Sequence, residues 1–171
     1  HALACSYQGI PIGSFGDVET FSFHSTKFVN SIEGGCLLTN DQSIAEKSRL
    51  MRNFGFEWYD SVVSIGTNAK MDEVRAAMGL TSLESMDQFI SRNQDNYQSY
   101  RSGLADISGI TLYQYPSDCQ VNFQYVVAII DARKFGLSRD QLVSILTAEN
   151  IFARRYFYPG CHRMEPYGTL V

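Results

Sequence analysis

Lys27 is the residue of this sequence whose surroundings most suggest covalent chemistry. It follows an alternating run, residues 20–24, that places Phe21 and Phe23 on one face of a predicted strand and polar side chains on the other. A lysine just past a strand end, with hydroxyls and an imidazole nearby, can be held in a dry pocket where its amine loses its proton more readily and forms a Schiff base. The spacing alone leaves another interpretation open, because most loop lysines are ordinary exposed side chains.

The elements that must position Lys27 follow from hydrophobic periodicity and from punctuation by turn residues. Gly34 and Gly35 let the backbone turn sharply after the lysine, and Asn40 or Asp41 supplies a helix N-cap. The first half of the chain is predicted to form a hairpin or loop over residues 2–16, a strand over 18–23, a short buried strand over 36–39, a helix over about 42–54 and a loop over 56–68. A long helix with a bend, or two consecutive helices, is predicted over 71–107. The remaining predicted elements are strands over 110–115 and 123–131, a helix to 150 that opens on the capping box Ser138-x-x-Gln141, and a last strand over 151–157.

Two of these segments have more than one interpretation. The loop over residues 56–68 carries Trp58 and Tyr59, and a loop of this length is functional, part of an interface, or simply packed on the surface. The apolar stripe of residues 71–107 is interpreted as core packing. Its members recur at three- and four-residue steps, and they are Val74, Ala77, Met78, Leu83, Met86, Phe89 and Ile90.

Composition narrows the class of protein. The chain has 171 residues, 44% of them hydrophobic, and a formal net charge of −4, which suits one globular unit or two small subdomains. The mild acidity and the lack of a Lys/Arg-rich run argue against a nucleic-acid partner, and no apolar run is long enough to cross a membrane. The four cysteines are scattered and form no metal-like spacing, so we expect reduced thiols in a cytoplasmic protein and no metal site.

An ordered set of motifs resembles one known family. The runs G-S-F-G-D-V-E-T-F-S-F-H-S-T-K and E-G-G-C-L-L-T-N-D are similar to the central motif of the DegT/DnrJ/EryC1/StrS sugar aminotransferases, which are fold-type-I pyridoxal-phosphate enzymes. R-N-F-G-F, G-T-N-A-K-M-D-E-V-R-A-A-M-G-L and A-R-R-Y-F-Y-P follow in the family's order. The resemblance implies an α/β fold in which residues 1–70 belong to the large cofactor-binding domain and 71–171 to the small α+β C-terminal domain with its long leading helix.

The resemblance also implies roles for single residues. Lys27 matches the lysine that forms the Schiff base with the cofactor, and Ser22 matches the serine that binds its phosphate. His24 matches a frequent pocket-lining histidine. Asn68 matches an asparagine that reaches the cofactor phosphate of the neighbouring subunit, which implies a homodimer with shared active sites.

Three further positions are weaker matches to the family. Many members have arginine where this chain has Lys70, so the charge is kept while the bidentate fork is lost. His162 lies in the family's C-terminal proline-histidine region, where a surface role and substrate contact are both open. His1 matches the fourth residue of an Asp-x-Ala-His motif, so we expect the aspartate that pairs with the cofactor ring nitrogen to precede this chain, and we expect the chain to be part of a longer enzyme.

The function implied for the longer enzyme is transfer of an amino group from glutamate to a nucleotide-linked keto sugar, such as a dTDP-4-keto-6-deoxyhexose, in amino-sugar and O-antigen polysaccharide biosynthesis. Three alternatives stay open at this point. The chain as given is a catalytically inert fragment or an isolated dimerising domain; the enzyme is a dehydratase of the same family, a branch with histidine in place of Lys27; or the chain is a regulatory binding module unrelated to the cofactor.

Overall fold

The structure, a computed structural model, describes residues 1–170, and they divide into two compact units. The first unit contains residues 1–100 and 114–126, and the second contains residues 101–113 and those from 127 onward. These units differ in extent from the predicted large-domain and small-domain segments, residues 1–70 and 71–171. That assignment concerns the complete family fold and stays a prediction.

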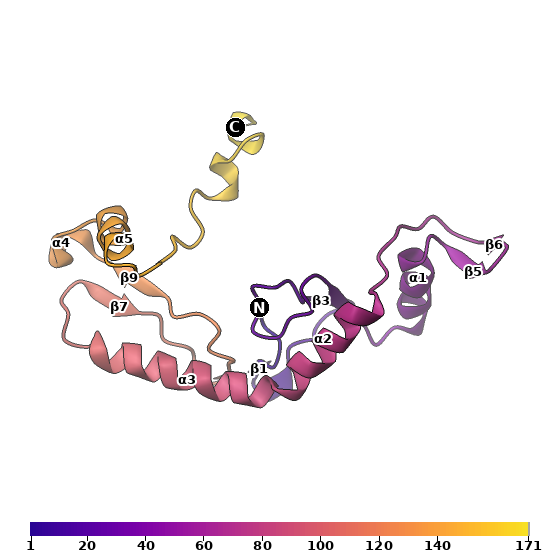
Figure 1. The fold of residues 1–171 in the computed structure, drawn as a ribbon, viewed down its shortest axis with the longest axis horizontal. Helices are drawn as coiled ribbons and strands as arrows, with labels where there is room; N and C mark the ends of the chain where they lie inside the picture. Colours follow the sequence, from indigo (N-terminus) through magenta and orange to yellow (C-terminus); the bar gives the residue numbers. More distant parts are fainter. Residues whose placement is uncertain (171) are drawn as a thin grey trace. The chain divides into compact units, whose positions relative to one another are not determined.

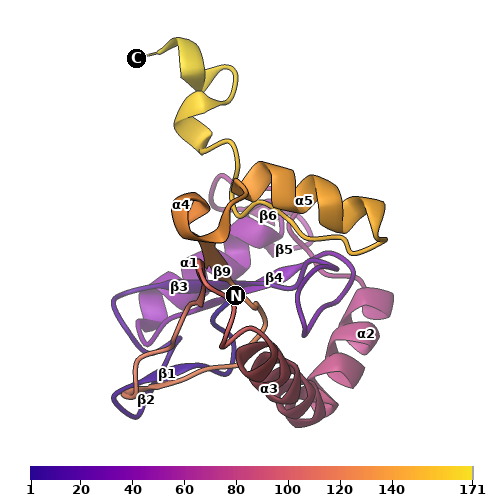
Figure 2. The same cartoon turned by 90° about the vertical axis from the view of Figure 1, so that its left-hand side faces the viewer.

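The first unit contains two small sheets built from its N-terminal strands, and the predicted reactive lysine follows a strand of the second. β1 (Ser6–Tyr7) and β2 (Ile10–Pro11) form a hairpin, and β8 (Cys119–Gln120) extends it in the order β2-β1-β8. A hairpin, one of the two structures predicted for residues 2–16, is therefore present. β3 (Glu19–Ser22) pairs antiparallel with β4 (Gly35–Leu38), with Ser22 opposite Gly35 (Figure 2).

The alternation predicted for β3 is confirmed, because Phe21 is buried while Thr20 and Ser22 are exposed. The prediction that β4 is buried is wrong. Its residues alternate between exposed and half-buried, and Leu37 keeps 44% of its surface accessible. A two-stranded sheet has a second face to cover, and β4 lies in such a sheet among the described residues.

The helix after β4 begins and ends as its signals indicate. α1 (Gln42–Arg52) is capped by Asp41, whose carboxylate accepts from the backbone N–H groups of Ser43 and Ile44. The segment after it is not wholly a loop, and that prediction is corrected here. β5 (Phe56–Trp58) and β6 (Ser61–Val62) form a two-stranded hairpin next to α1 (Figure 1).

The long helical segment is two consecutive helices, α2 (Glu73–Glu84) and α3 (Met86–Gly103), as one of the two predictions stated. The interpretation of their apolar stripe as core is wrong for most of its length. Val74, at 74% accessible, is exposed, as are Met78, Leu83 and Phe89. The buried residues of these helices are Ser82 on α2 and Tyr97 on α3.

The interior of the first unit is small and partly polar. Its most buried side chains are Phe21, Val29, Ser31, Ser82, Tyr97 and Asn122. Tyr97 packs against Tyr115 and Phe123 with ring centroids 5.6 and 5.2 Å away, which fixes the segment 114–126 against α3. Buried polar groups must find partners, and the three polar residues of this set all bond to backbone groups.

The second unit has a two-stranded antiparallel sheet, β7 (Ile110–Leu112) with β9 (Ala128–Ile130), shorter than the predicted strands. α4 (Ala132–Phe135) and α5 (Arg139–Ala148) follow (Figure 1). The predicted capping box between Ser138 and Gln141 opens α5. Two short 3-10 turns, η1 (Cys161–Arg163) and η2 (Tyr167–Thr169), come last.

The predicted last strand over residues 151–157 is wrong. This segment is irregular, its backbone makes a tight local bond from Ala153 N–H to the Ile151 carbonyl, and Phe152 is 79% accessible. Alternating side chains form a strand only where a neighbouring strand takes the backbone bonds.

Within residues 1–170, no helix combines the length and the apolar character that crossing a membrane requires. All four cysteines are free thiols, as predicted.

Candidate functional site

Lys27 lies in the connection between β3 and β4, which backbone hydrogen bonds close into a compact turn. Phe23 N–H donates to the Gly34 carbonyl at 2.8 Å, and Ser31 N–H donates to the Phe23 carbonyl at 2.9 Å. Within the turn, Lys27 N–H donates to the His24 carbonyl at 2.9 Å. We call residues 23–34 the Lys27 turn. The lysine thus lies just past a strand end, as the sequence predicted.

The imidazole of His24 is fixed inside the Lys27 turn. Its Nδ1 lies 2.9 Å from Thr26 Oγ1, and its Nε2 lies 3.6 Å from Glu33 Oε1. The Ser22 hydroxyl accepts from the backbone N–H of His24 at 3.3 Å. The Ser22 hydroxyl and the Lys27 backbone N–H thus both bond to the backbone of His24, just past the end of β3.

Helix α2 holds the Lys27 turn from one side. Asn30 N–H donates to the buried Ser82 hydroxyl at 3.1 Å, and the Asn30 amide donates to the Lys27 carbonyl at 3.2 Å. Gly34 permits this close approach, because a Cβ there would lie 2.6 Å from Met71 Cε and 2.7 Å from Ser31 Oγ. The backbone that carries the lysine is therefore held from the helix and from within the turn.

A segment distant in sequence, residues 122–125, holds the Lys27 turn from the other side. The buried Asn122 amide donates to the carbonyls of His1 and Leu3 at 2.8 and 2.9 Å. The Tyr125 hydroxyl lies 3.2 Å from His1 Nε2, and Gln124 Nε2 donates to the Thr26 carbonyl at 3.4 Å. His1 is thus joined to the same segment that reaches the turn.

The segment that follows His1 is partly desolvated. Burial is the main cause that raises the pKa of the Cys5 thiol, and a hydrogen bond with the Asn122 backbone acts in the opposite direction.

Two other predicted site residues lie on the strand-like segment after the β5–β6 hairpin. Asn68 is exposed and pairs through its backbone with Asn53 in an isolated antiparallel bridge. The Lys70 ammonium lies 4.9 Å from the centroid of the Phe54 ring. Their predicted roles at a neighbouring subunit and at an anionic substrate group stay predictions.

His162 belongs to the second unit and lies in η1. A Cβ on Gly160 would lie 2.7 Å from His162 Cε1, so the ring packs against the glycine backbone. Contact with substrate stays a prediction for this residue.

Sequence reasoning missed Asn122, Gln124 and Tyr125, because their segment resembled the start of a strand over 123–131. Phe123 has φ of 51°, a left-handed conformation that interrupts any strand and turns the neighbouring polar side chains toward the Lys27 turn. The available signal was the pair of amides, Asn122 and Gln124, inside an otherwise apolar run.

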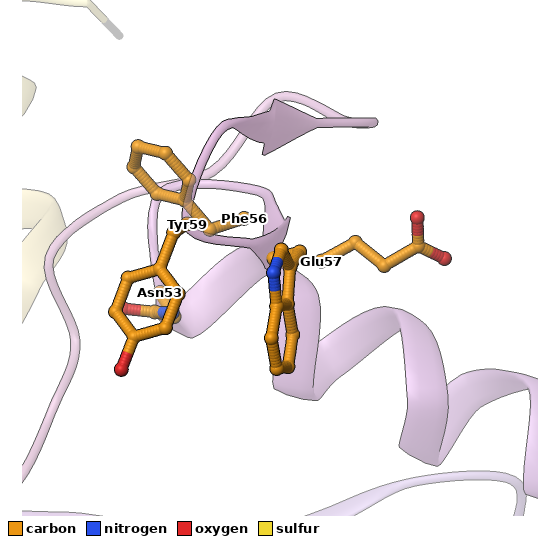
Figure 3. A pocket seen from close by; sticks show the side chains of 5 residues that line it. Asn53, Phe56, Glu57 and Tyr59 are labelled. Atoms are coloured by element: carbon orange, nitrogen blue, oxygen red, sulfur yellow. The ribbon is translucent and has the colours of Figure 1, made fainter.

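The hairpin that contains Trp58 and Tyr59 borders a hollow of about 450 Å³ (Figure 3). It is lined by Asn53, Phe56, Glu57, Trp58 and Tyr59. The rings of Trp58 and Tyr59 meet edge to face at 5.4 Å and are 71% and 84% accessible. This hollow is an open aromatic surface rather than an enclosed site.

Ser22 and the Lys27 turn fit the cofactor that the resemblance implies, a phosphorylated aldehyde. Lys27 would supply an amine for the aldehyde carbon, and Ser22 would supply a hydroxyl donor for a phosphate oxygen. Gln124 Oε1 is buried and takes no hydrogen bond from any described residue, so it is an acceptor with spare capacity beside the turn. Among residues 1–170, no group of His, Cys, Asp and Glu suits a metal ion.

Comparisons with known proteins identify the family of the chain. The sequence model of the DegT/DnrJ/EryC1/StrS aminotransferase family matches residues 1–171. A dTDP-4-amino-4,6-dideoxy-D-glucose transaminase of Shigella dysenteriae is 42% identical over 168 residues, which are 98% of this chain and 45% of that protein. A GDP-perosamine synthase of Vibrio cholerae is 32% identical over 99% of this chain and 46% of its own length.

A solved structure, that of DesI in the presence of its TDP-sugar product, superposes with a TM-score of 0.91 at 46% identity, over 98% of this chain and 43% of DesI. The chain thus spans less than half the length of these relatives. Its α/β fold is that of the sugar aminotransferases, and the cofactor of this family is pyridoxal phosphate. The chain therefore belongs to the DegT/DnrJ/EryC1/StrS aminotransferase family.

Proposed function

We propose that the complete protein containing this chain is a pyridoxal-phosphate aminotransferase that moves an amino group from glutamate to a nucleotide-linked keto sugar. The observation that carries the proposal is the end of β3, where the Ser22 hydroxyl and the Lys27 backbone N–H both bond to the backbone of His24 and the His24 ring meets Thr26. A dTDP-linked 4-keto-6-deoxyhexose is the proposed acceptor, because relatives 42% and 46% identical are named for dTDP- and TDP-sugars.

Each site residue of this chain has its own proposed role. Lys27 holds the cofactor covalently through Nζ, and once released the same amine acts as the base and acid that moves a proton on the substrate carbon. Ser22 donates to the phosphate, His24 lines the pocket between Thr26 and Glu33, and His1 borders it. The bound cofactor would supply an electron sink for the carbanion that proton removal leaves.

A homodimer with shared sites is part of the proposal, with Asn68 reaching the phosphate in the neighbouring subunit and Lys70 or His162 meeting the substrate. Asn68 and Lys70 are exposed and lie on a segment separate from the Lys27 turn, which suits contact with another copy. We place the enzyme in the cytoplasm, in amino-sugar and O-antigen polysaccharide biosynthesis. A relative 30% identical is the Bacillus subtilis spore coat polysaccharide biosynthesis protein SpsC, which supports the polysaccharide setting.

The test is Lys27→Ala in the complete protein, with Lys47→Ala as a matched control on the exposed side of α1. Lys27→Ala is expected to remove the visible absorbance of covalently held pyridoxal phosphate and to lower turnover by at least about 10³-fold, since the nucleophile and the proton carrier are lost together. Lys47→Ala is expected to keep both. Turnover retained in Lys27→Ala would overturn the proposal.

Product analysis separates the remaining alternatives. A dehydratase would release a deoxygenated sugar without new nitrogen, whereas the proposed enzyme transfers nitrogen from ¹⁵N-glutamate to the sugar. The 171-residue chain assayed alone, with added pyridoxal phosphate, tests whether this portion holds the cofactor by itself. We expect weak binding and no turnover from it, because it spans less than half of the relatives' length.

A further inference from the structure

We infer that Phe54 is a positioning residue for Lys70, and that the Lys70 ammonium held over the Phe54 ring binds a phosphate oxyanion of the nucleotide-linked sugar or of the cofactor. The inference rests on the proposed function, which supplies these two phosphorylated ligands. The ring contact would make a lysine effective at a position where many family members have arginine.

The contact between the two side chains is direct. The Lys70 ammonium lies over the face of the Phe54 ring, 4.9 Å from its centroid. A cation within about 6 Å of a ring centroid is attracted by the negative face of the π-system. Phe54 is itself braced, because the Phe56 ring meets it edge to face with centroids 6.5 Å apart. Lys70 therefore has a preferred direction, although its four-carbon stem is flexible.

The backbone that carries Phe54 has an uncommon conformation. Its φ is 59°, in the left-handed region that a bulky residue seldom adopts. Phe54 N–H donates to the Thr67 carbonyl at 3.1 Å, and Ala69 N–H donates to the Arg52 carbonyl at 2.9 Å. The segment that ends in Lys70 is therefore fastened to the end of α1. Strain of this kind persists only where the surrounding structure maintains it, and at functional sites it often places a side chain.

The charge of Lys70 is available to a ligand. Among the residues that the structure describes, no carboxylate forms an ion pair with Lys70, and the side chain is exposed. An ammonium has three donors and no acceptor, and a ring face offers no lone pair, so these donors suit an oxyanion. Phosphate is the oxyanion that fits, because lysine binds phosphate as a point charge, whereas a planar carboxylate is matched best by the fork of arginine.

The consequence of the ring contact is preorganisation. A lysine that swings freely loses rotamer freedom when it binds a ligand, whereas a lysine already held on a ring loses less. Removal of the ring should therefore weaken phosphate binding without touching the reacting atoms. The expected size is that of one exposed cation–π contact, about two- to fivefold in affinity.

The first measurement follows Lys70 in the complete protein and does not depend on activity. Acylation by a small activated ester is quantified residue by residue by mass spectrometry, with exposed Lys47 of α1 as the internal reference. Phe54→Leu is expected to raise the Lys70 rate about two- to fivefold, because the amine must leave the ring face to react. Phe54→Tyr keeps a ring and should react like wild type. Phe152→Leu, which removes an exposed ring of the second unit, is the matched control.

Protection by ligands identifies the phosphate that Lys70 binds. dTDP and pyridoxamine phosphate, neither of which forms a Schiff base with lysine, are titrated separately against the acylation of Lys70. Protection by dTDP would assign Lys70 to the sugar nucleotide, and protection by pyridoxamine phosphate would assign it to the cofactor. In either case the protecting concentration should rise about two- to fivefold in Phe54→Leu and stay near the wild-type value in Phe54→Tyr.

A second variant keeps the test valid if Phe54→Leu folds poorly. A fluorinated phenylalanine at position 54 keeps the shape of the ring and weakens its negative face, so it should raise the Lys70 rate as Phe54→Leu does. An unchanged Lys70 rate with the fluorinated ring would overturn the inference. So would a lack of protection by both ligands in wild type.

A double-mutant cycle distinguishes positioning from a general effect on structure. In a Lys70→Met background, Phe54→Leu should cause no further loss of affinity for the protecting ligand, measured by calorimetry, since the ring acts through the ammonium. Equal losses in both backgrounds would contradict the positioning role. A failure of the proposed function is separate, because it would show as turnover in Lys27→Ala.

Discussion

The Lys27 turn and the Trp58–Tyr59 hairpin are two excursions of the same unit with opposite construction. In the turn, Ser31 is fully buried and Val29 is 1% accessible, and bonds from α2 and from residues 122–125 hold the backbone. In the hairpin, Trp58 and Tyr59 are 71% and 84% accessible at the tip. The turn is held by polar contacts from distant segments, whereas the aromatic tip is exposed to solvent.

The difference in burial between the turn and the hairpin corresponds to two different functions, presenting a reactive group and offering a contact surface. A reactive amine must be presented in one orientation, and small deviations are costly in rate. An exposed aromatic pair is useful as a contact surface for something outside this chain, and its own stability does not depend on being covered. The hairpin is nevertheless anchored at its base, where Gly55 is buried against the backbone of Ser64.

The largest expected effect on stability comes from a substitution at Gly55, at the base of the hairpin. Gly55→Ala would place a Cβ on top of the Ser64 carbonyl oxygen at a residue whose φ is +80°. Backbone atoms cannot move aside cheaply, so we expect a loss of about 3 kcal/mol or more in the free energy of unfolding. Urea denaturation measures it. Gly136→Ala is the matched control, because φ there is +86° while nothing lies within 4 Å of its added Cβ. Equal losses in both variants would show that strain in φ, not the close approach, decides the outcome.

A smaller loss of unfolding free energy is expected when the hydrogen bonds made by residues 122–125, which we call the polar clamp of the Lys27 turn, are removed. Asn122→Ala removes a buried amide that donates to His1 and Leu3 and accepts from Gln124. The two carbonyls lose their donor, and we expect a cost of about 2 kcal/mol in unfolding free energy together with reduced cofactor binding. The exposed Asn68→Ala should cost far less stability. The clamp would be unimportant if Asn122→Ala were as stable as wild type.

The smallest expected effect on stability comes from substitutions at the exposed tip of the hairpin. Trp58→Ala and Tyr59→Ala should change the free energy of unfolding by less than about 0.5 kcal/mol, since most of both side chains is already in water. Chemical denaturation of the two variants beside wild type checks this. A loss above about 1.5 kcal/mol would show that the rings are covered in solution, by another part of the protein or by a second copy.

The sequence was sufficient to predict the parts of the fold that local chemistry determines. Asp41 and the Ser138–Gln141 pair began their helices as predicted, and Phe21 was buried by strand alternation. The last strand failed because the apolar and aromatic residues of 151–157 favour a strand, but no strand among the described residues pairs with them, which composition does not reveal. The stripe on α2 failed because apolar spacing indicates a face but not what covers it.

The candidate site was predictable only where it is local in sequence. Ser22, His24 and Lys27 lie within a few residues of each other and were identified together by motif. Asn122 and Gln124 were not, because their proximity to the turn depends on a left-handed Phe123 and on packing against Tyr97. No spacing rule relates a side chain to a backbone carbonyl 98 positions away, as the Gln124 amide and the Thr26 carbonyl are.

The long sequence separation between Thr26 and Gln124 has a consequence for folding during synthesis on the ribosome. The chain leaves the first unit after Tyr100, returns for residues 114–126, and leaves again. The turn that carries Lys27 is synthesised before the segment that holds it, so its bond to Gln124 can form only after nearly a hundred further residues have emerged. Any shorter product that stops at residue 100 would contain the reactive lysine without the clamp. Completion of the site is therefore coupled to completion of the following segment of the chain.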